Sequence, residues 1–474
     1  MTVVKKWHMK GDVQMKKTET LTKEIINSFQ SAMRDVESLN EFFYRSNKTL
    51  VDYQLYNEKS CLQGKKIADL FDQIVEYDGY KERNKKIEEI KSIELEPGIK
   101  VSDVCNIVPC SKENDTLRYS IKKEYRNKLC YSPTEAKKKY DHINKYEYIL
   151  KESILSHIIV SFENYLSQIY RLLLETTPLL YFENQTILLA DVFKENFLEA
   201  ITDKFESEID NKMRNSLDAL SLICAKENID INRYEKIVES FTEIYYRRNA
   251  YVHTQGKANK DYMKKVSSSF LKNISDNDFL VCDDIYIENS IITLCKLLFS
   301  IAYELLVKFN ATVENIEAIS MIFFEKLKQK QYILCKYAYY SLSQNKSVPF
   351  LNRTMYRMNY INAAKQLDEK DLVKKELEKL DISIATDNFK IGKHCLEDNY
   401  EQVYKMLKET YPNTFDAIAI REWPIFINFR ETELYEKFAS EHADDFEMQC
   451  LELEMKPQKE VAETESADAE KNEG

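Results

Sequence analysis

The sequence predicts an all-α protein, and three observations support this prediction. The 474 residues include only 7 glycines and 8 prolines, so strong helix formers run for long stretches without interruption. Apolar residues recur at three- and four-residue intervals along most of the chain, which is the spacing of amphipathic helices. The two closest glycines, Gly64 and Gly79, are 15 residues apart. This spacing excludes GxGxxG, GxxxxGK[ST] and GxSxG motifs, and with them a nucleotide-binding glycine loop.

The length of the chain indicates more than one domain. We expect four regions from the changes in composition. They are an N-terminal, mostly helical region over residues 1–140, a central helical bundle over 141–309, a C-terminal helical-hairpin array over 310–447, and an acidic disordered tail over 448–474.

The N-terminal region shows helical spacing from Thr18 to Ile93, with breaks expected near Asn47 and Gly79. Residues 96–109 (EPGIKVSDVCNIVP) are rich in β-branched side chains and bounded by proline, which favours a strand or a hairpin. No chemistry is assigned to this region.

The central region begins with one long amphipathic helix that ends before Pro178. His157 lies on this apolar helix, and we interpret it as a core residue. Further helices are expected over residues 190–209, 212–226, 233–253 and 284–309. Short connections between such helices predict an antiparallel bundle.

The C-terminal region is typical of short helix pairs. Helices are expected over residues 313–328, 331–342, 354–367, 371–380, 389–396 and 400–408. Two similar segments, 367–380 and 396–407, are offset by 29 residues, which resembles a degenerate tetratricopeptide-type array. The alternative is a plain helical domain. A groove in an array of this kind could hold a regulatory protein.

Charge and cysteine usage indicate a cytoplasmic protein. The formal net charge is −11, but Glu452 to Gly474 alone contributes 8 acids against 3 bases. The ten cysteines form no CxxC pair and no His/Cys cluster, so we expect no metal site, no cofactor and no disulfide framework. The strongly apolar run Ser153 to Phe162 is too short to span a bilayer, and no membrane partner is expected.

One group of residues carries chemistry, at the end of the helix expected over 233–253. Arg248 lies four residues after Ile244 and four before Val252, on the apolar stripe of that helix. A guanidinium aimed toward an apolar side requires a partner, since burying it alone is costly. Asn249 and His253 stack one turn apart, and the helix is expected to stop at Gly256.

The same stretch is locally basic. Residues 244–272 contain seven bases against the single acid Asp261, a net charge of +6 within an acidic chain. A surface of this charge attracts a polyanion such as RNA. Tyr245, Tyr246, Tyr251 and Tyr262 interleave with the bases and either stack on unpaired nucleobases or belong to the core. The predicted RNA-binding bases are Arg247, Lys257, Lys260, Lys264 and Lys265.

Residues 246–256, YRRNAYVHTQG, resemble the signature of the HEPN superfamily in its common form R-N-x-x-x-H. None of the other five histidines has an arginine four to six residues before it. Residues 156–174 are similar to the first helix of HEPN domains, and the resemblance covers about Lys145 to Phe309.

This resemblance implies a metal-independent endoribonuclease that acts as a homodimer on single-stranded RNA. It implies that His253 serves as general acid or base, that Arg248 holds the phosphate, and that Asn249 orients either of these groups. It also suggests that Glu163 pairs with Arg248. The expected product is a 2′,3′-cyclic phosphate, and the suggested role is a toxin-like or antiphage defence effector. The alternative is a non-catalytic HEPN dimerisation scaffold or regulatory interaction protein.

Overall fold

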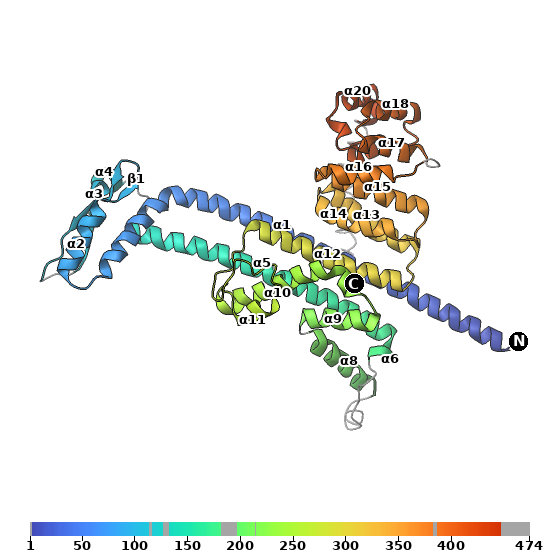
Figure 1. The fold of residues 1–474 in the computed structure, drawn as a ribbon, viewed down its shortest axis with the longest axis horizontal. Coiled ribbons are helices and arrows are strands. Elements are labelled where there is room, and N and C mark those ends of the chain that lie inside the picture. Colours follow the sequence, from blue (N-terminus) through green and yellow to red (C-terminus); the bar gives the residue numbers. More distant parts are fainter. Residues whose placement is uncertain are drawn as a thin grey trace, which may run out of the picture. The chain divides into compact units, whose positions relative to one another are not determined.

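The computed structural model describes residues 2–112, 116–126, 132–181, 197–213, 215–382 and 386–446. Helices make up most of this part of the chain, and its only sheets are two short antiparallel pairs, so the all-α prediction is confirmed (Figure 1). The expected acidic tail, residues 448–474, lies outside the described residues.

The chain forms two compact units, each assembled from separate segments. Unit 1 comprises Met1–Met33, Phe162–Val238 and Ile292–Gly474, and unit 2 comprises Arg34–Ser161 and Glu239–Ile291. Helices that cross from one unit to the other join these segments. The four regions expected from composition, with boundaries at residues 140, 309 and 447, stay a prediction.

The framework of unit 2 is an antiparallel pair of long helices, α1 (Thr2–Val75) and α5 (Pro133–Thr176). The helices approach closely at Gly64, where a Cβ atom would lie 2.7 Å from the Cβ of Ala136. Lys137 forms an ion pair with Asp69 at 2.9 Å across the same contact. The break expected near Asn47 is wrong, because α1 is continuous there and the Asn47 amide donates to Asp284 at 2.7 Å.

A small mixed module connects these two helices. It has its own apolar core. Of the strand or hairpin expected over 96–109, strands are present at β2 and β3, separated by the short helix α3, and β3 pairs with β4, which lies beyond that range, in the register Cys105–Ile121 to Val108–Arg118. The interruption expected near Gly79 is confirmed, because α1 ends before it and α2 begins after it. The elements are α2 (Tyr80–Lys91), β1 (Glu94–Glu96), β2 (Ile99–Lys100), α3 (Val101–Val104), β3 (Cys105–Val108), β4 (Arg118–Ile121) and α4 (Lys123–Arg126).

Unit 2 is completed by the end of α10, by the short helix α11 and by the start of α12. The elements of the central region, which extend over both units, are α6 (Pro178–Tyr181), α8 (Phe197–Met213), α9 (Ser216–Glu227), the 3-10 helix η1 (Ile231–Tyr234), α10 (Glu235–Thr254), α11 (Lys260–Lys265) and α12 (Asp284–Lys308). The first seven residues of the helix expected over 190–209 lie outside the described residues, and the rest falls on α8.

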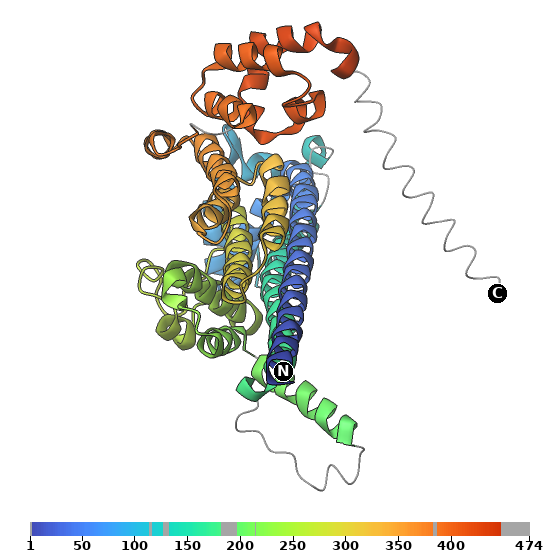
Figure 2. The ribbon, with the colours of Figure 1, turned by 90° about the vertical axis from the view of Figure 1, so that its right-hand side faces the viewer.

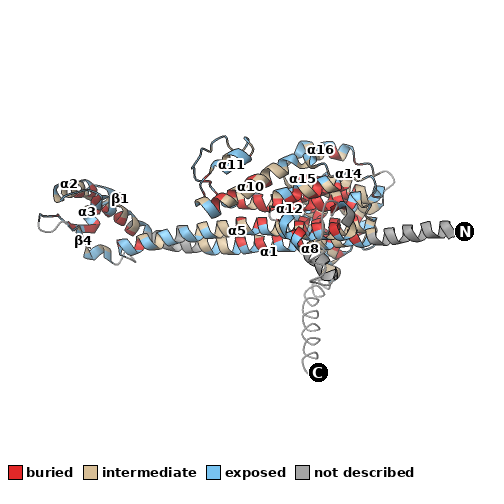
Figure 3. Cartoon of the chain, turned by 90° about the horizontal axis from the view of Figure 1, so that it is seen from below, coloured by how far each residue is buried: buried red, intermediate tan, exposed pale blue. Residues whose placement is uncertain are grey.

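The core of unit 1 forms around α12. Tyr165 of α5 donates to the carbonyl of Leu298 at 3.4 Å, and Phe299 packs against Phe323 with ring centres 5.0 Å apart. By length and composition, α12 is the one described helix that could cross a membrane. Because 72% of its apolar window is buried inside the protein, α12 has the character of a core helix (Figure 3).

The rest of unit 1 is a series of short helices stacked along the chain (Figure 2). All six helices expected here are present, with ends shifted by at most four residues. The last four elements were not foreseen. The series is α13 (Val313–Lys328), α14 (Tyr332–Gln344), α15 (Phe350–Gln366), α16 (Lys370–Glu378), α17 (Asp387–Leu396), α18 (Tyr400–Thr410), α19 (Ala417–Glu422), η2 (Pro424–Phe426), η3 (Phe429–Glu431) and α20 (Glu433–Glu441).

Candidate active site at the end of helix α10

Helix α10 ends one residue before a left-handed turn. Gln255 has φ 55 and Gly256 has φ 78, and the Gly256 amide donates back to the carbonyl of Ala250 at 3.0 Å. This hydrogen bond, from an amide to a carbonyl six residues earlier, satisfies the Ala250 carbonyl at the helix end. A Cβ on Gly256 would lie 2.8 Å from the ring of Phe279, so the site requires glycine for conformation and for space. The predicted helix end is confirmed.

The buried face of α10 agrees with the expected apolar stripe at Phe241 and Ile244 but differs at the two arginines. Arg247, which the sequence analysis assigns to an RNA-binding surface, is buried, whereas Arg248 is only half-buried. The inward face also includes Glu243, Ala250 and Tyr251, so it is broader than the predicted stripe and takes in Arg247 in place of Arg248. Arg247 can be buried because the buried Glu243, one turn before it, gives its guanidinium a partner inside the protein.

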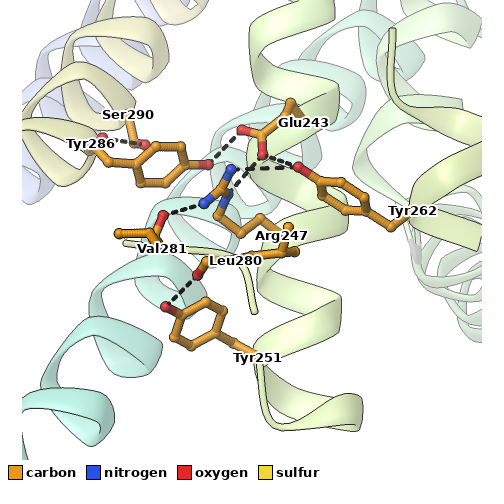
Figure 4. A network of polar contacts seen from close by, with 8 residues as sticks. All are labelled: Glu243, Arg247, Tyr251, Tyr262, Leu280, Val281, Tyr286 and Ser290. Atoms are coloured by element: carbon orange, nitrogen blue, oxygen red, sulfur yellow. Dashed lines mark hydrogen bonds and ion pairs between the residues drawn. The ribbon is translucent and has the colours of Figure 1, made fainter. Parts of the chain in front are cut away.

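The partner is Glu243, and a network of tyrosines surrounds the pair (Figure 4). Arg247 Nε donates to Glu243 Oε1 at 2.7 Å, and the side chains are 10% and 2% exposed. The hydroxyls of Tyr262 and Tyr286 each donate to Glu243 at 2.6 Å, and Arg247 also donates to the carbonyl of Val281. Both carboxylate oxygens of Glu243 thus accept hydrogen bonds, and the third nitrogen of Arg247 lies 3.5 Å from the Tyr262 hydroxyl.

The network changes the acidity of its members. Burial acts to lower the pKa of Arg247, but Tyr286, Glu243 and Tyr262 together raise it above its usual value. Burial, followed by the charge of Glu243, raises the pKa of Tyr286 and Tyr262. Burial also raises the pKa of the nearby Cys282 thiol to about 12. The Arg247 guanidinium therefore stays charged, and the surrounding hydroxyls and thiol stay neutral, at physiological pH.

The same face of α10 holds the returning chain. The Leu280 amide donates to the carbonyl of Gly256 at 2.8 Å, and the Ala258 amide to that of Asp278 at 2.8 Å. The Tyr251 hydroxyl donates to the Leu280 carbonyl at 2.9 Å, and its ring stacks on Tyr148 of α5, with ring centres 5.1 Å apart. The end of α10 is therefore a rigid platform.

Arg248, Asn249 and His253 project from this platform. His253 is exposed in the last turn, Asn249 is half-buried one turn before it, and Arg248 is half-buried with its Nε atom buried. The guanidinium carbon of Arg248 lies 5.7 Å from the ring centre of Tyr245. Five residues of helix correspond to a rotation of about 500°, so Arg248 and His253 leave the axis about 140° apart. Asn249 and His253 share a face.

The predicted RNA-binding lysines lie directly after the helix. Lys257, Lys260, Lys264 and Lys265 are all exposed, the last three on α11. Asn259 caps α11 by accepting from the Tyr262 amide at 2.9 Å. The structure therefore brings four lysines to the surface near His253 and removes Arg247 from that set.

Other expected residues have different surroundings. Tyr251 and Tyr262 are buried, so they belong to the core and not to a base-stacking surface. His157 is exposed and not a core residue, with Nδ1 2.8 Å from the carbonyl of Ser153, so that prediction is wrong. Glu163 is half-buried on α5, in unit 1, and its pairing with Arg248 stays a prediction.

An exposed apolar patch lies beside this site and was not foreseen. We define it by Phe279, Val281 and Ile285, which are 54%, 67% and 68% exposed. Residues 279–283 alternate between exposed and buried, as expected of an extended segment with one free face. The sequence itself shows only a short apolar run, Phe279 to Cys282, which does not reveal which of its residues are exposed. Four exposed aspartates flank the patch: Asp276, Asp278, Asp283 and Asp284.

Within the described ranges, no three His, Cys, Asp or Glu residues group as a metal site would require. Comparison of the chain with protein-family models, with curated proteins and with solved structures found no match. The function therefore has to be inferred from the chemistry of the site.

Proposed function

We propose that the protein is a metal-independent endoribonuclease that cleaves single-stranded RNA at the end of α10. The observation that carries this proposal is the R-N-x-x-x-H segment on the last turns of a helix held by a buried network, with His253 exposed and four exposed lysines directly after it. The resemblance of residues 246–256 to the HEPN signature supports the same reaction.

The residue types match cleavage by the RNA 2′-hydroxyl. His253 takes the proton from that hydroxyl, or returns one to the leaving oxygen, because an imidazole nitrogen can either accept or donate a proton. The 2′-oxygen forms a bond to phosphorus while the bond to the 5′-oxygen breaks. Arg248 stabilises the charge on the phosphorane with its guanidinium fork, and Asn249 orients the imidazole or the phosphate. The products carry a 2′,3′-cyclic phosphate and a 5′-hydroxyl.

We further propose that two copies form the complete cleft. Because Arg248 and His253 leave one helix about 140° apart, a second copy allows the arginine of one and the histidine of the other to face one phosphate. The exposed apolar patch supplies a contact surface. The patch is flanked by exposed aspartates and the site by exposed lysines, so pairing of acids from one copy with bases from the other would favour a two-fold arrangement.

The four exposed lysines give this site its affinity for RNA. Neutralising phosphates with lysines releases counterions, so binding should weaken steeply as salt rises. Replacing Lys257, Lys260, Lys264 and Lys265 by glutamine should lower both the affinity and its salt dependence, because fewer counterions are released. A toxin-like or antiphage role follows only if expression of the active protein arrests growth and expression of the His253→Ala variant does not.

The alternative is a non-catalytic scaffold that dimerises and binds a regulatory protein. The exposed apolar patch is equally a surface for that function. A hollow of about 740 Å³ between α15, α16 and α17, lined by Lys365, Lys374 and Lys393 among others, is a candidate for the regulatory partner. In a scaffold of this kind His253 has no chemical role.

The two functions are separated by RNA cleavage in the presence of a chelator. Purified full-length protein is incubated with end-labelled single-stranded RNA, alongside Arg248→Ala and His253→Ala. Matched controls are Arg118→Ala and His157→Ala, which remove an exposed arginine and an exposed histidine of the same unit. We expect cleavage by the wild type and both controls and its loss in both site variants. Intact RNA with all five proteins would overturn the nuclease proposal.

A further inference from the structure

A lysine with no acidic partner lies on α12, far along the sequence from the proposed active site. Lys296 is half-buried, and among the described residues it has no carboxylate within ion-pair distance. The charged group that acts on it is another cation, Lys336 of α14. Burial and this neighbour together lower the pKa of Lys296. A half-buried cation facing a like charge destabilises the fold unless an anion compensates it.

The carboxylate paired with Lys336 is already engaged. Lys336 forms an ion pair with Glu369, and the two side chains are 26% and 35% exposed. One acid therefore stands against two lysines, and the group keeps a net positive charge that is open to solvent on one side.

An aromatic ring and two hydroxyls fix the position of Lys296. The Ser300 hydroxyl donates to the Lys296 carbonyl at 2.7 Å, and the hydroxyls of Tyr337 and Ser300 are 2.6 Å apart. Since the Ser300 proton is used, the Tyr337 hydroxyl donates to Ser300. The Tyr337 ring is thereby held 5.7 Å from the Lys296 ammonium. The three protons of that ammonium have no acceptor in this cluster.

We propose that Lys296 and Lys336 form a binding site for a phosphate group on the face shared by α12 and α14. Lysine is a compact point charge, which suits a phosphate oxygen that approaches from solvent. The phosphate comes either from a free ligand, such as inorganic phosphate or a nucleotide, or from an RNA backbone. All five residues named in this cluster belong to unit 1, whereas Arg248 and His253 belong to unit 2, and the proposal does not depend on the nuclease proposal.

A purely structural role for Lys296 makes a different prediction. If the contact with the Tyr337 ring is its only function, Lys296→Met should lower the melting temperature, because a cation–π contact is lost. If Lys296 instead belongs to an anion-binding site, Lys296→Met should raise the melting temperature of the unliganded protein, because it removes an uncompensated cation. The melting temperature in a buffer free of phosphate decides between these two readings.

The direct test is a calorimetric titration of the full chain with three probes in turn. The probes are inorganic phosphate, a nucleoside triphosphate, and a short single-stranded RNA in the His253→Ala background, which keeps the RNA intact. We expect saturable binding of at least one probe, and affinity at least about tenfold lower in Lys296→Gln and Lys336→Gln. Lys346→Gln, at an exposed lysine of the same unit, is the matched control and should bind as the wild type does.

A measurement on the unmutated protein guards against misfolded variants. Reductive methylation with ¹³C labels each lysine, and the Lys296 signal, assigned with Lys296→Arg, should shift and its pKa should rise when the ligand binds. Binding of the triphosphate or of phosphate identifies a free ligand, and binding of RNA alone identifies the backbone. No saturable binding, or equal binding by Lys296→Gln and the control, overturns the proposal. Cleavage of RNA by Lys296→Gln at the wild-type rate leaves the nuclease proposal untouched.

Discussion

Removing one member of the buried Glu243–Arg247 pair should loosen the platform that carries the candidate site. Glu243→Gln leaves a buried guanidinium without its anion, and the cost of breaking such a pair is about 3 to 5 kcal/mol. Arg247→Met should cost less, because Glu243 keeps the hydroxyls of Tyr262 and Tyr286. The double variant should be far less destabilised than the sum, with a coupling of at least about 1.5 kcal/mol.

Amide hydrogen exchange measures this effect where it occurs. The Leu280 amide, bonded to the Gly256 carbonyl at 2.8 Å, reports opening of the segment that the network holds. A loss of about 3 kcal/mol corresponds to exchange roughly 100-fold faster. The control pair Glu41–Arg45 has the same four-residue spacing in α1 but is 63% and 80% exposed. Its variants should change stability by less than about 0.5 kcal/mol. The reasoning is refuted if Glu243→Gln accelerates Leu280 exchange no more than Glu41→Gln does.

Three further predictions follow from the same part of the molecule. Gly256→Ala should destabilise unit 2 by about 1 to 2 kcal/mol in thermal unfolding, because a Cβ clashes with the Phe279 ring and φ is positive. Adding Phe279→Ala should remove only the cost of the clash. Full recovery of stability would mean that the positive φ costs nothing. The pKa of Tyr286, Tyr262 and Cys282 is raised in the folded protein, so these groups should contribute stability that is complete below about pH 8 and lost progressively as the pH rises from about 9 to 12. The loss should be shallower in Tyr286→Phe, and a pH-independent stability from about 8 to 11 would contradict this. Ile285→Asp should shift the protein toward monomers in analytical sedimentation, whereas Val75→Asp, at another exposed apolar residue, should not. If neither variant changes the sedimenting mass, the apolar patch is not the dimer contact.

Most of the helices could be predicted because their signals are local. The helices expected over 313–328 and 284–309 match α13 and α12 almost residue for residue, since apolar spacing and flanking capping residues define them. The break predicted near Asn47 is wrong because the signals that keep α1 helical there are not local. The low helix propensity of Asn47 is outweighed by α1 packing and by a hydrogen bond to Asp284, 237 residues away.

The site could be predicted by residue type but not by orientation. The spacing of Arg248 and His253 identifies them as candidate site residues. The same reasoning places Arg247 on the surface, because a hydrophobic pattern treats arginine and glutamate as exposed polar residues. Only the tertiary fold brings Tyr262 and Tyr286 to Glu243 and makes that polar pair the inward face. The exposed apolar patch and the unpaired Lys296 likewise depend on what packs against them, which spacing along one helix does not record.

The nature of the cut is the most direct test of the central claim. A short single-stranded RNA is digested in a chelator, the ends are identified by mass, and the same RNA is prepared with one 2′-deoxynucleotide at the mapped site. Attack by the 2′-hydroxyl with His253 and Arg248 predicts a 2′,3′-cyclic phosphate and no cleavage at the deoxy position. A 3′-hydroxyl end, or undiminished cleavage at the deoxy position, would contradict the account.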